Sequence, residues 1–267
     1  MKGTTSAASI TALLCFTVLT GCNSSPEDIL VELGIDVEKP EIEELPDFAA
    51  IADVNEMKSE FFDYLEPIVT YHDQVIREQR QILLGLMQKI SAGQALVADE
   101  QEFLQWLAAE YEVDLEEHGQ EGAVVLLERR VDVIPQPLVM VQAAKESGWG
   151  RSRFAVEANN LFGQWCYSAG CGLVPQARAE GLKNEVKYFD SIDEAIESYM
   201  KNLNTHASYL DFRLIREELR EEEKALTGNA LADGLLYYSQ RRQAYVDEIK
   251  TMLRQYHDFQ ALQQNQD

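Results

Sequence analysis

Residues 143–166 read AAKESGWGRSRFAVEANNLFGQWC, and this stretch decides how the chain around it folds. Upstream, Pro137 suits the first turn of a helix that runs through LVMVQAAKE, and Gly148 supplies its stop. Glu146 therefore ends an apolar helix and precedes two glycines that bracket a tryptophan. The position of this carboxylate at a helix C-terminus is the feature that needs an explanation.

A carboxyl group at this position is expected to hold its proton. The helix macrodipole disfavours negative charge at a C-terminus, and apolar neighbours such as Val139, Ala143 and Trp149 desolvate the group. Both effects predict a raised pKa for Glu146. A carboxyl protonated near neutral pH is what general-acid cleavage of a glycosidic bond requires. The alternative is that Glu146 is a solvent-exposed residue at the end of a helix and has no catalytic role.

Composition excludes several classes of function. The 267 residues are 46% hydrophobic and 26% charged, which is typical of a globular chain of one or two domains. The formal net charge of −23 argues strongly against binding to nucleic acid or to an anionic membrane by bulk electrostatics, although an acidic protein can act on a neutral sugar polymer. No nucleotide-binding loop and no G-x-S-x-G elbow occurs, so no cofactor is expected.

The N-terminus, residues 1–21, is typical of an export signal. Its apolar run, ITALLCFTVLTGC, is too short to span a membrane as a helix. Residues 19–22, LTGC, resemble the lipobox of bacterial lipoproteins, which implies cleavage before Cys22 and lipidation of that cysteine. Because Asn23 is not the aspartate associated with inner-membrane retention, we expect a periplasmic protein attached to the outer membrane by this lipid alone. An ordinary secretory signal is the alternative.

This processing would leave two cysteines in the mature chain, because it would remove Cys15 and acylate Cys22. Cys166 and Cys171 are expected to form one disulfide in an oxidising periplasm. Zinc binding is the competing interpretation. The four histidines are scattered and none completes a ligand set around C-x4-C, so we expect no metal.

The remaining chain divides into three parts. Residues 22–50 are acidic and aperiodic, which suits a tether or a disordered tail. Residues 51–130 show an amphipathic helix from Met57, with a kink expected at Pro67, and a second helix that begins near Asp99 with a capping acid. We expect this helical region to buttress the rest rather than to contact a partner. Residues 131–262 predict a helix, a short hairpin and further helices, one of them opened by Ser191.

Two blocks in the third part, ESGWG at 146–150 and NNLFG at 159–163, resemble the glucosaminidase family of peptidoglycan hydrolases. Four further features resemble the Bax-like branch of this family. They are the cysteine pair, SYMKNLNTH at 198–206, GLLYYSQRRQAYVDEI at 234–249 and FFDYLEP at 61–67. The resemblance implies a mainly α protein with a lysozyme-like α+β catalytic domain, which carries a small β-hairpin and follows the helical N-terminal region. It also implies that the chain cleaves β-1,4 bonds at N-acetylglucosamine in murein glycan.

The resemblance assigns Glu146 as the general acid and places a second acid on the hairpin, here from about Leu173 to Phe189. Glu180 is preferred and Glu185 is the alternative. The threonine-glutamate-tyrosine signature of the family is absent at this point. Either glutamate can also be a merely solvated hairpin residue.

Five further residues are candidates for substrate binding, each with a structural alternative. Asn160 can bind an acetamido group or cap a turn, and Phe162, like the neighbouring Trp165, can stack on a sugar ring or fill the core. The other three are Trp149, Tyr238 and Tyr245. A lytic transglycosylase, which needs one catalytic glutamate, and a non-catalytic murein-binding lipoprotein are the competing functions.

Overall fold

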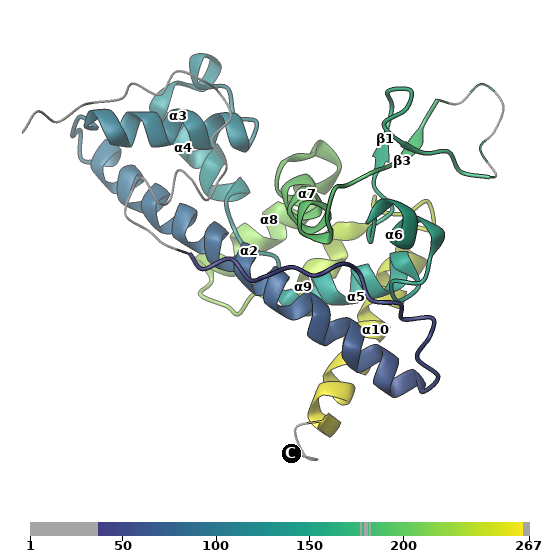
Figure 1. Cartoon of the computed structure of the whole chain (residues 1–267). Helices are drawn as coiled ribbons and strands as arrows, with labels where there is room; N and C mark the ends of the chain where they lie inside the picture. The colour runs from purple at the N-terminus through teal and green to yellow at the C-terminus, as the bar shows by residue number, and fades with distance from the viewer. Residues whose placement is uncertain (1–36, 177, 179–180, 182, 264–267) are drawn as a thin grey trace, which may run out of the picture.

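The computed structural model describes residues 37–176, 178, 181 and 183–263. Its longest element is helix α2, Val54–Ser91, which crosses the molecule diagonally in Figure 1. The helix begins where the side chain of Asp53 accepts hydrogen bonds from the backbone N–H groups of Asn55 and Glu56, at 2.8 and 2.9 Å. It continues through Pro67 as one helix. Helix α2 links two separate hydrophobic cores.

The smaller core lies where α3, Ala98–Glu110, and α4, Leu115–Arg130, cover the second half of α2. Its centre holds four fully buried leucines: Leu83, Leu104, Leu107 and Leu127. The sequence predicts that Asp99 caps this helix, but the helix already begins at Ala98. The N-cap residue is Val97, whose N–H donates to the carboxylate of Glu100 at 3.1 Å, and Asp99 lies in the first turn.

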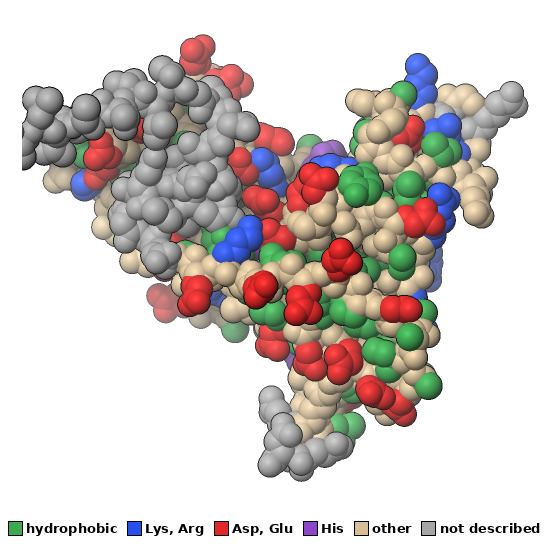
Figure 2. Space-filling model, viewed as in Figure 1, with side chains coloured by type: hydrophobic (Ala, Val, Ile, Leu, Met, Phe, Trp, Pro, Cys, Tyr) green, Lys and Arg blue, Asp and Glu red, His purple; other side chains and the backbone are tan. Residues whose placement is uncertain are grey.

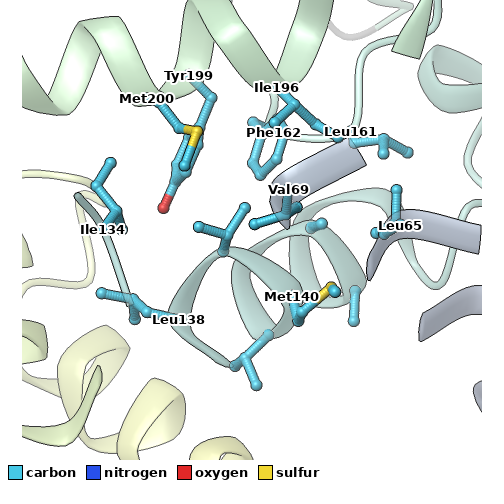
Figure 3. Packing of buried hydrophobic residues seen from close by; sticks show 14 of the residues in the cluster. Leu65, Val69, Ile134, Leu138, Met140, Leu161, Phe162, Ile196, Tyr199 and Met200 are labelled. Atoms are coloured by element: carbon cyan, nitrogen blue, oxygen red, sulfur yellow. The ribbon is translucent and has the colours of Figure 1, made fainter. Parts of the chain in front are cut away.

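The main core surrounds α5, Gln136–Ser147. This helix packs against α2 and against the C-terminal helices α9 (Gly228–Leu231) and α10 (Gln243–Gln263), and η2 (Ala232–Leu235) packs against α9 and α10. Figure 3 shows Leu138 and Met140 of α5 among residues from α2, from the NNLFG turn and from α7. The helix ends at Gly148 in the left-handed conformation, with φ 60°, as its sequence predicts.

The small sheet follows helix α6, Arg153–Ala158. Strands β1 (Trp165–Cys166), β3 (Glu185–Lys187) and β2 (Gly172–Leu173) lie antiparallel in this order, with Leu173 opposite Val186. The hairpin is therefore where the sequence predicts it, and β1 adds a third strand. Gly172 is required by close packing, because a Cβ atom there would lie 1.9 Å from the carbonyl oxygen of Val186.

Helix α7, Ile192–Thr205, returns the chain to the main core and leads through η1, Ala207–Tyr209, into α8, Leu210–Glu221. The hydroxyl of Ser191 accepts from the N–H of Glu194 at 3.2 Å, which confirms the predicted cap. The described part of the chain is thus mainly helical with one small antiparallel sheet, as expected for a lysozyme-like α+β protein.

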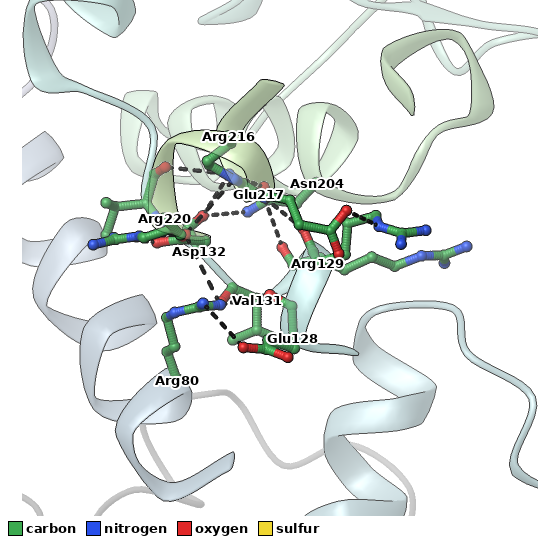
Figure 4. A network of polar contacts seen from close by, with 11 residues as sticks. Arg80, Glu128, Arg129, Val131, Asp132, Asn204, Arg216, Glu217 and Arg220 are labelled. Atoms are coloured by element: carbon green, nitrogen blue, oxygen red, sulfur yellow. Dashed lines mark hydrogen bonds and ion pairs between the residues drawn. The ribbon is translucent and has the colours of Figure 1, made fainter. Parts of the chain in front are cut away.

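Two arginines, the partly buried Arg80 and the buried Arg216, cap the C-terminus of α4 (Figure 4). Arg80 donates to the carbonyl oxygens of Glu128 and Val131, and Arg216 donates to those of Arg129 and Arg130. A helix C-terminus leaves four carbonyl groups unpaired, so these contacts stabilise it. Asp132 balances the charge, at 2.7 Å from Arg220 and 3.9 Å from both Arg80 and Arg216.

Residues 37–50 have no helix or strand and run along α2 (Figure 1). Phe48 is buried against Phe61, the Tyr64 hydroxyl donates to the carbonyl oxygen of Glu43, and Lys39 pairs with Asp193 at 2.8 Å. This half of the predicted tether therefore packs on the body. The predicted signal, Cys22 and residues 23–36 lie outside the described residues.

Acidic side chains are scattered across the described part of the face seen in Figure 2, in keeping with the net charge of −23. None of the helices in the described part of the chain combines the length and the apolarity that crossing a lipid bilayer requires.

Candidate active site

Glu146 lies in the last turn of α5, with its side chain partly buried. Burial raises the pKa of its carboxyl group above the ordinary value of 4.5, and the neighbouring Glu248 raises it further. A hydrogen bond from Tyr245 and the charge of Lys145 act in the opposite direction. One carboxylate oxygen, Oε1, is buried without a hydrogen-bond partner. The direction of the pKa shift is the one that the sequence predicts.

Four tyrosines lie close enough to Glu146 for its charge to raise their pKa values: Tyr199, Tyr209, Tyr238 and Tyr245. Burial is the larger cause in each, and it brings the pKa of Tyr209 to about 12. The phenols therefore stay protonated at neutral pH and can act as hydrogen-bond donors beside the carboxylate.

A groove of about 540 Å³ opens beside this cluster. The NNLFG turn and strand β1 form one wall of this groove. Helix α7 and the segment that follows it form the other wall. Its lining combines aromatic rings with amide and hydroxyl groups: Phe162, Gln164, Trp165, Tyr167, Ser198, Asn202, Thr205, Tyr209, Tyr237 and Tyr238. Trp165, Tyr167 and Tyr237 are 47%, 76% and 54% exposed. Exposed rings next to polar groups suit a sugar polymer.

Glu146 is not itself among the residues that line this groove. Tyr238 connects the two, because it lines the groove and its ring stacks on that of Tyr245, with centroids 5.4 Å apart. Tyr245 in turn bonds to Glu146. The Tyr238 hydroxyl donates to the carbonyl oxygen of Phe162 at 3.0 Å and so ties this segment to the opposite wall.

The second acid has no confirmed position. Glu180 lies outside the described residues. Glu185 is buried in β3, where its carboxylate accepts from the N–H groups of Gly170 at 3.2 Å and Gly172 at 3.0 Å. These hydrogen bonds hold its pKa below the ordinary value. Glu185 thus organises the turn closed by the disulfide, and Glu112 is the one acid among the groove residues that the structure describes.

Two residues of the NNLFG block have structural roles. The amide of Asn160 donates to the carbonyl oxygens of Gln164 and Lys187 and accepts from the N–H groups of Phe162 and Gln164. Its four hydrogen-bonding positions are therefore occupied. Phe162 stacks on Tyr199, with centroids 4.0 Å apart, and is 2% exposed.

Trp149 is not brought together with the groove residues. Its ring contacts Phe61 and Phe62 and lies under Lys58. It lines a separate cavity of about 340 Å³ between α2 and α10. The next residue, Gly150, has φ 70° and would place a Cβ atom 2.6 Å from the Phe48 ring, so glycine is required there.

Cys166 and Cys171 form the predicted disulfide. These two cysteines and Glu185 are the one set of potential metal ligands that lie together among the described residues. Both sulfur atoms are covalently bonded to each other, so the zinc alternative has no thiolate to use at this place.

Sequence reasoning missed Gln142, which lies one helical turn before Glu146 and is completely buried. A polar residue four positions before a candidate catalytic acid, on the same helix face, was the available signal. Sequence reasoning also missed that Glu112 lines the groove. Glu112 lies in the distant loop between α3 and α4, and no local pattern in the sequence points to it.

Comparison with known proteins supports the resemblance. Residues 122–258 match the model of the Glucosaminidase family, described as mannosyl-glycoprotein endo-beta-N-acetylglucosaminidase. The chain is 32% identical to Protein bax of Escherichia coli (strain K12) over 218 residues, which cover 82% of this chain and 75% of that protein. No solved structure matches the chain.

Proposed function

The chain belongs to the glucosaminidase family, and from this premise we propose that it hydrolyses β-1,4 bonds at N-acetylglucosamine in the glycan strands of murein. The observation that carries the proposal is a partly buried carboxyl group with a raised pKa, Glu146, beside a groove lined by aromatic and amide side chains. No cofactor enters the proposed reaction.

In the proposed reaction Glu146 donates its proton to the bridging oxygen while the bond from that oxygen to C1 of N-acetylglucosamine breaks. Water then adds to C1 and returns a proton. The carboxylate left behind is stabilised by the Tyr245 hydroxyl and by the charge of Lys145. Since Tyr238 stands between the groove and this carboxylate, the proposal requires its side chain to move when the glycan binds.

A lytic transglycosylase is the second candidate, and the position of Glu185 favours it. That carboxylate is held by two backbone N–H groups, so it is not free to activate water. A site with Glu146 as its only acid would close an anhydro ring on the sugar instead of adding water. Glu180 remains the proposed second acid of the hydrolase.

Purified murein incubated with the protein, followed by mass spectrometry of the soluble products, tests both candidates. The hydrolase releases fragments with N-acetylglucosamine at the reducing end, and the transglycosylase releases anhydromuramic acid. Glu146→Gln should abolish either product, whereas Glu157→Gln, on the exposed surface of α6, should leave it unchanged. If Glu146→Gln releases as much product as the wild type, the acid assignment is wrong. If neither protein releases product, the murein-binding lipoprotein is favoured.

The proposed location follows from the predicted signal. We propose a periplasmic enzyme held at the outer membrane by a lipid on Cys22. Labelling of cells with a radioactive fatty acid, with Cys22→Ser as the comparison, tests this attachment.

A further inference from the structure

Gln142 is a buried polar residue with both ends of its amide in use. It lies on α5 one turn before Glu146, with an exposed fraction of 0%. Its Oε1 accepts a hydrogen bond from the Tyr199 hydroxyl at 2.5 Å. Its Nε2 donates to the Tyr245 hydroxyl at 3.0 Å. These partners are 57 and 103 residues away along the chain, so the fold places them around this side chain.

The chemistry of the amide fixes the direction of these bonds. A carbonyl oxygen only accepts, so Tyr199 must direct its proton at Gln142. An amide nitrogen only donates, so the oxygen of Tyr245 receives that bond and its own proton is left for another acceptor. The carboxylate of Glu146 is the group to which Tyr245 is hydrogen-bonded.

We propose that Gln142 is a positioning residue that holds the Tyr245 hydroxyl with its proton directed at Glu146. The inference rests on the proposed role of Glu146 as general acid. It adds that the acid is controlled by a chain of three side chains, Tyr199 to Gln142 to Tyr245, of which only Tyr245 contacts Glu146. Gln142 itself is not among the residues that line the groove.

Loss of the amide has a predictable effect. Without the bond from Nε2 the Tyr245 hydroxyl can rotate, and the Glu146 carboxylate loses an aligned donor. A carboxylate without its donor binds its proton more tightly. The acid then stays protonated to higher pH but transfers its proton less readily, so kcat should fall while KM changes little.

The experiment compares pH profiles of kcat/KM on soluble murein glycan for the wild type, Gln142→Met, Tyr245→Phe and the double variant. Methionine has a similar length and no amide. We expect the alkaline limb to move up by about half to one pH unit in each single variant, the size of one hydrogen-bond contribution to a carboxyl pKa. The double variant should move no further than Tyr245→Phe alone. A limb that stays in place in Gln142→Met, or shifts that add in the double variant, would overturn the inference.

Two further variants separate positioning from stability. Tyr199→Phe removes the bond that fixes the amide, so the amide can turn and accept from Tyr245; we expect the same upward shift. Gln79→Met is the matched control, because Gln79 is 2% exposed and accepts from the Tyr111 hydroxyl at 2.7 Å in the other part of the molecule. It should cost comparable stability and leave the limb unchanged. An equal shift in Gln79→Met contradicts the inference.

A readout without activity separates this inference from the proposed function. Carbon-13 NMR of the side-chain carboxyl groups follows the titration of Glu146 directly, with Glu146→Gln to assign its signal. A higher midpoint in Gln142→Met supports the positioning role, even if the wild type proves inactive on murein. An unchanged midpoint overturns it, even if the enzyme is active.

Discussion

The rings of Tyr238 and Tyr245 lie parallel, 8° apart in plane and 5.4 Å apart at their centroids. Tyr238 lines the groove and Tyr245 bonds to Glu146, so this stack is the physical link between the place where a glycan can lie and the acid that would cleave it. The order of the three side chains explains how Glu146 keeps a partly dry environment beside an open groove.

Activity on murein should fall as pH rises through the pKa of Glu146. A general acid works in its protonated form, and burial raises this pKa above its usual value. The alkaline limb of kcat/KM should therefore lie above the ordinary glutamate value of 4.5. Initial rates on soluble glycan between pH 4 and 9 measure it. A limb at or below that ordinary value would contradict the role of Glu146.

Trp165→Ala should raise KM roughly ten-fold, equivalent to about 1.4 kcal/mol, and leave stability unchanged. The Trp165 ring lines the groove and is 47% exposed, so its loss removes a surface for a sugar ring but no core contact. Tyr188→Ala is the control, because Tyr188 is 50% exposed and lies outside the groove lining. Equal effects of the two changes would remove the groove as the glycan site.

The free energy of unfolding should rise as pH falls from 8 to 5, because of Asp73. Burial raises the pKa of this carboxyl to about 7, its Oδ1 has no partner, and Arg77 is 3.8 Å away. A raised folded pKa means that stability is fully present below the unfolded pKa and is lost as pH rises through about 7. The loss amounts to at most about 4 kcal/mol, at about 1.4 kcal/mol per pKa unit.

Asp73→Asn should raise stability at pH 8 and flatten this dependence, as measured by urea denaturation at several pH values. Asp63→Asn, on the exposed face of the same helix, is the control and should do neither. If the free energy of unfolding of Asp73→Asn changes with pH as steeply as that of the wild type, a group other than Asp73 causes the pH dependence.

Asp132→Asn should lower the free energy of unfolding by about 3 kcal/mol or more, because it leaves buried arginine charge unbalanced. Asp132 is 2% exposed, and burial lowers the pKa of its neighbour Arg216 to about 10. Glu217→Gln, which breaks the more exposed pair with Arg129, should cost about 1 kcal/mol or less. Chemical denaturation measures both. Equal costs would mean that the cap of α4 does not depend on Asp132.

Phe48→Ala should destabilise the protein by about 3 to 5 kcal/mol. Its ring is 1% exposed and packs edge-on against Phe61, so the segment before α2 is part of the main core. Val54→Ala, at a side chain that is 58% exposed, is the control and should change little. Thermal unfolding of the two variants decides whether residues 37–50 stabilise the fold or only follow its surface.

Local features were predictable because short-range chemistry determines them. Gly148 ends α5 since only a residue that tolerates positive φ fits there, Ser191 opens α7 through its own hydroxyl, and the spacing of Cys166 and Cys171 allows one short closed turn. The direction of the pKa shift of Glu146 was also predictable, because a carboxyl group at the end of an apolar helix is expected to be buried, and burial is the largest cause in the structure. The cap of α3 was misplaced because Asp99 and Glu100 both suit a first turn.

The sequence by itself indicated α2, α5, α7, the hairpin, the disulfide and the acid that ends α5, each from residues within a short stretch of the chain. Only the tertiary structure decided that Gln142 would meet Tyr199 and Tyr245, that Glu185 would be held by the turn at Gly170–Gly172, and that Trp149 would lie away from the groove. The reason is that packing of two hydrophobic cores brings distant segments together, and the bonds made there depend on every element that packs.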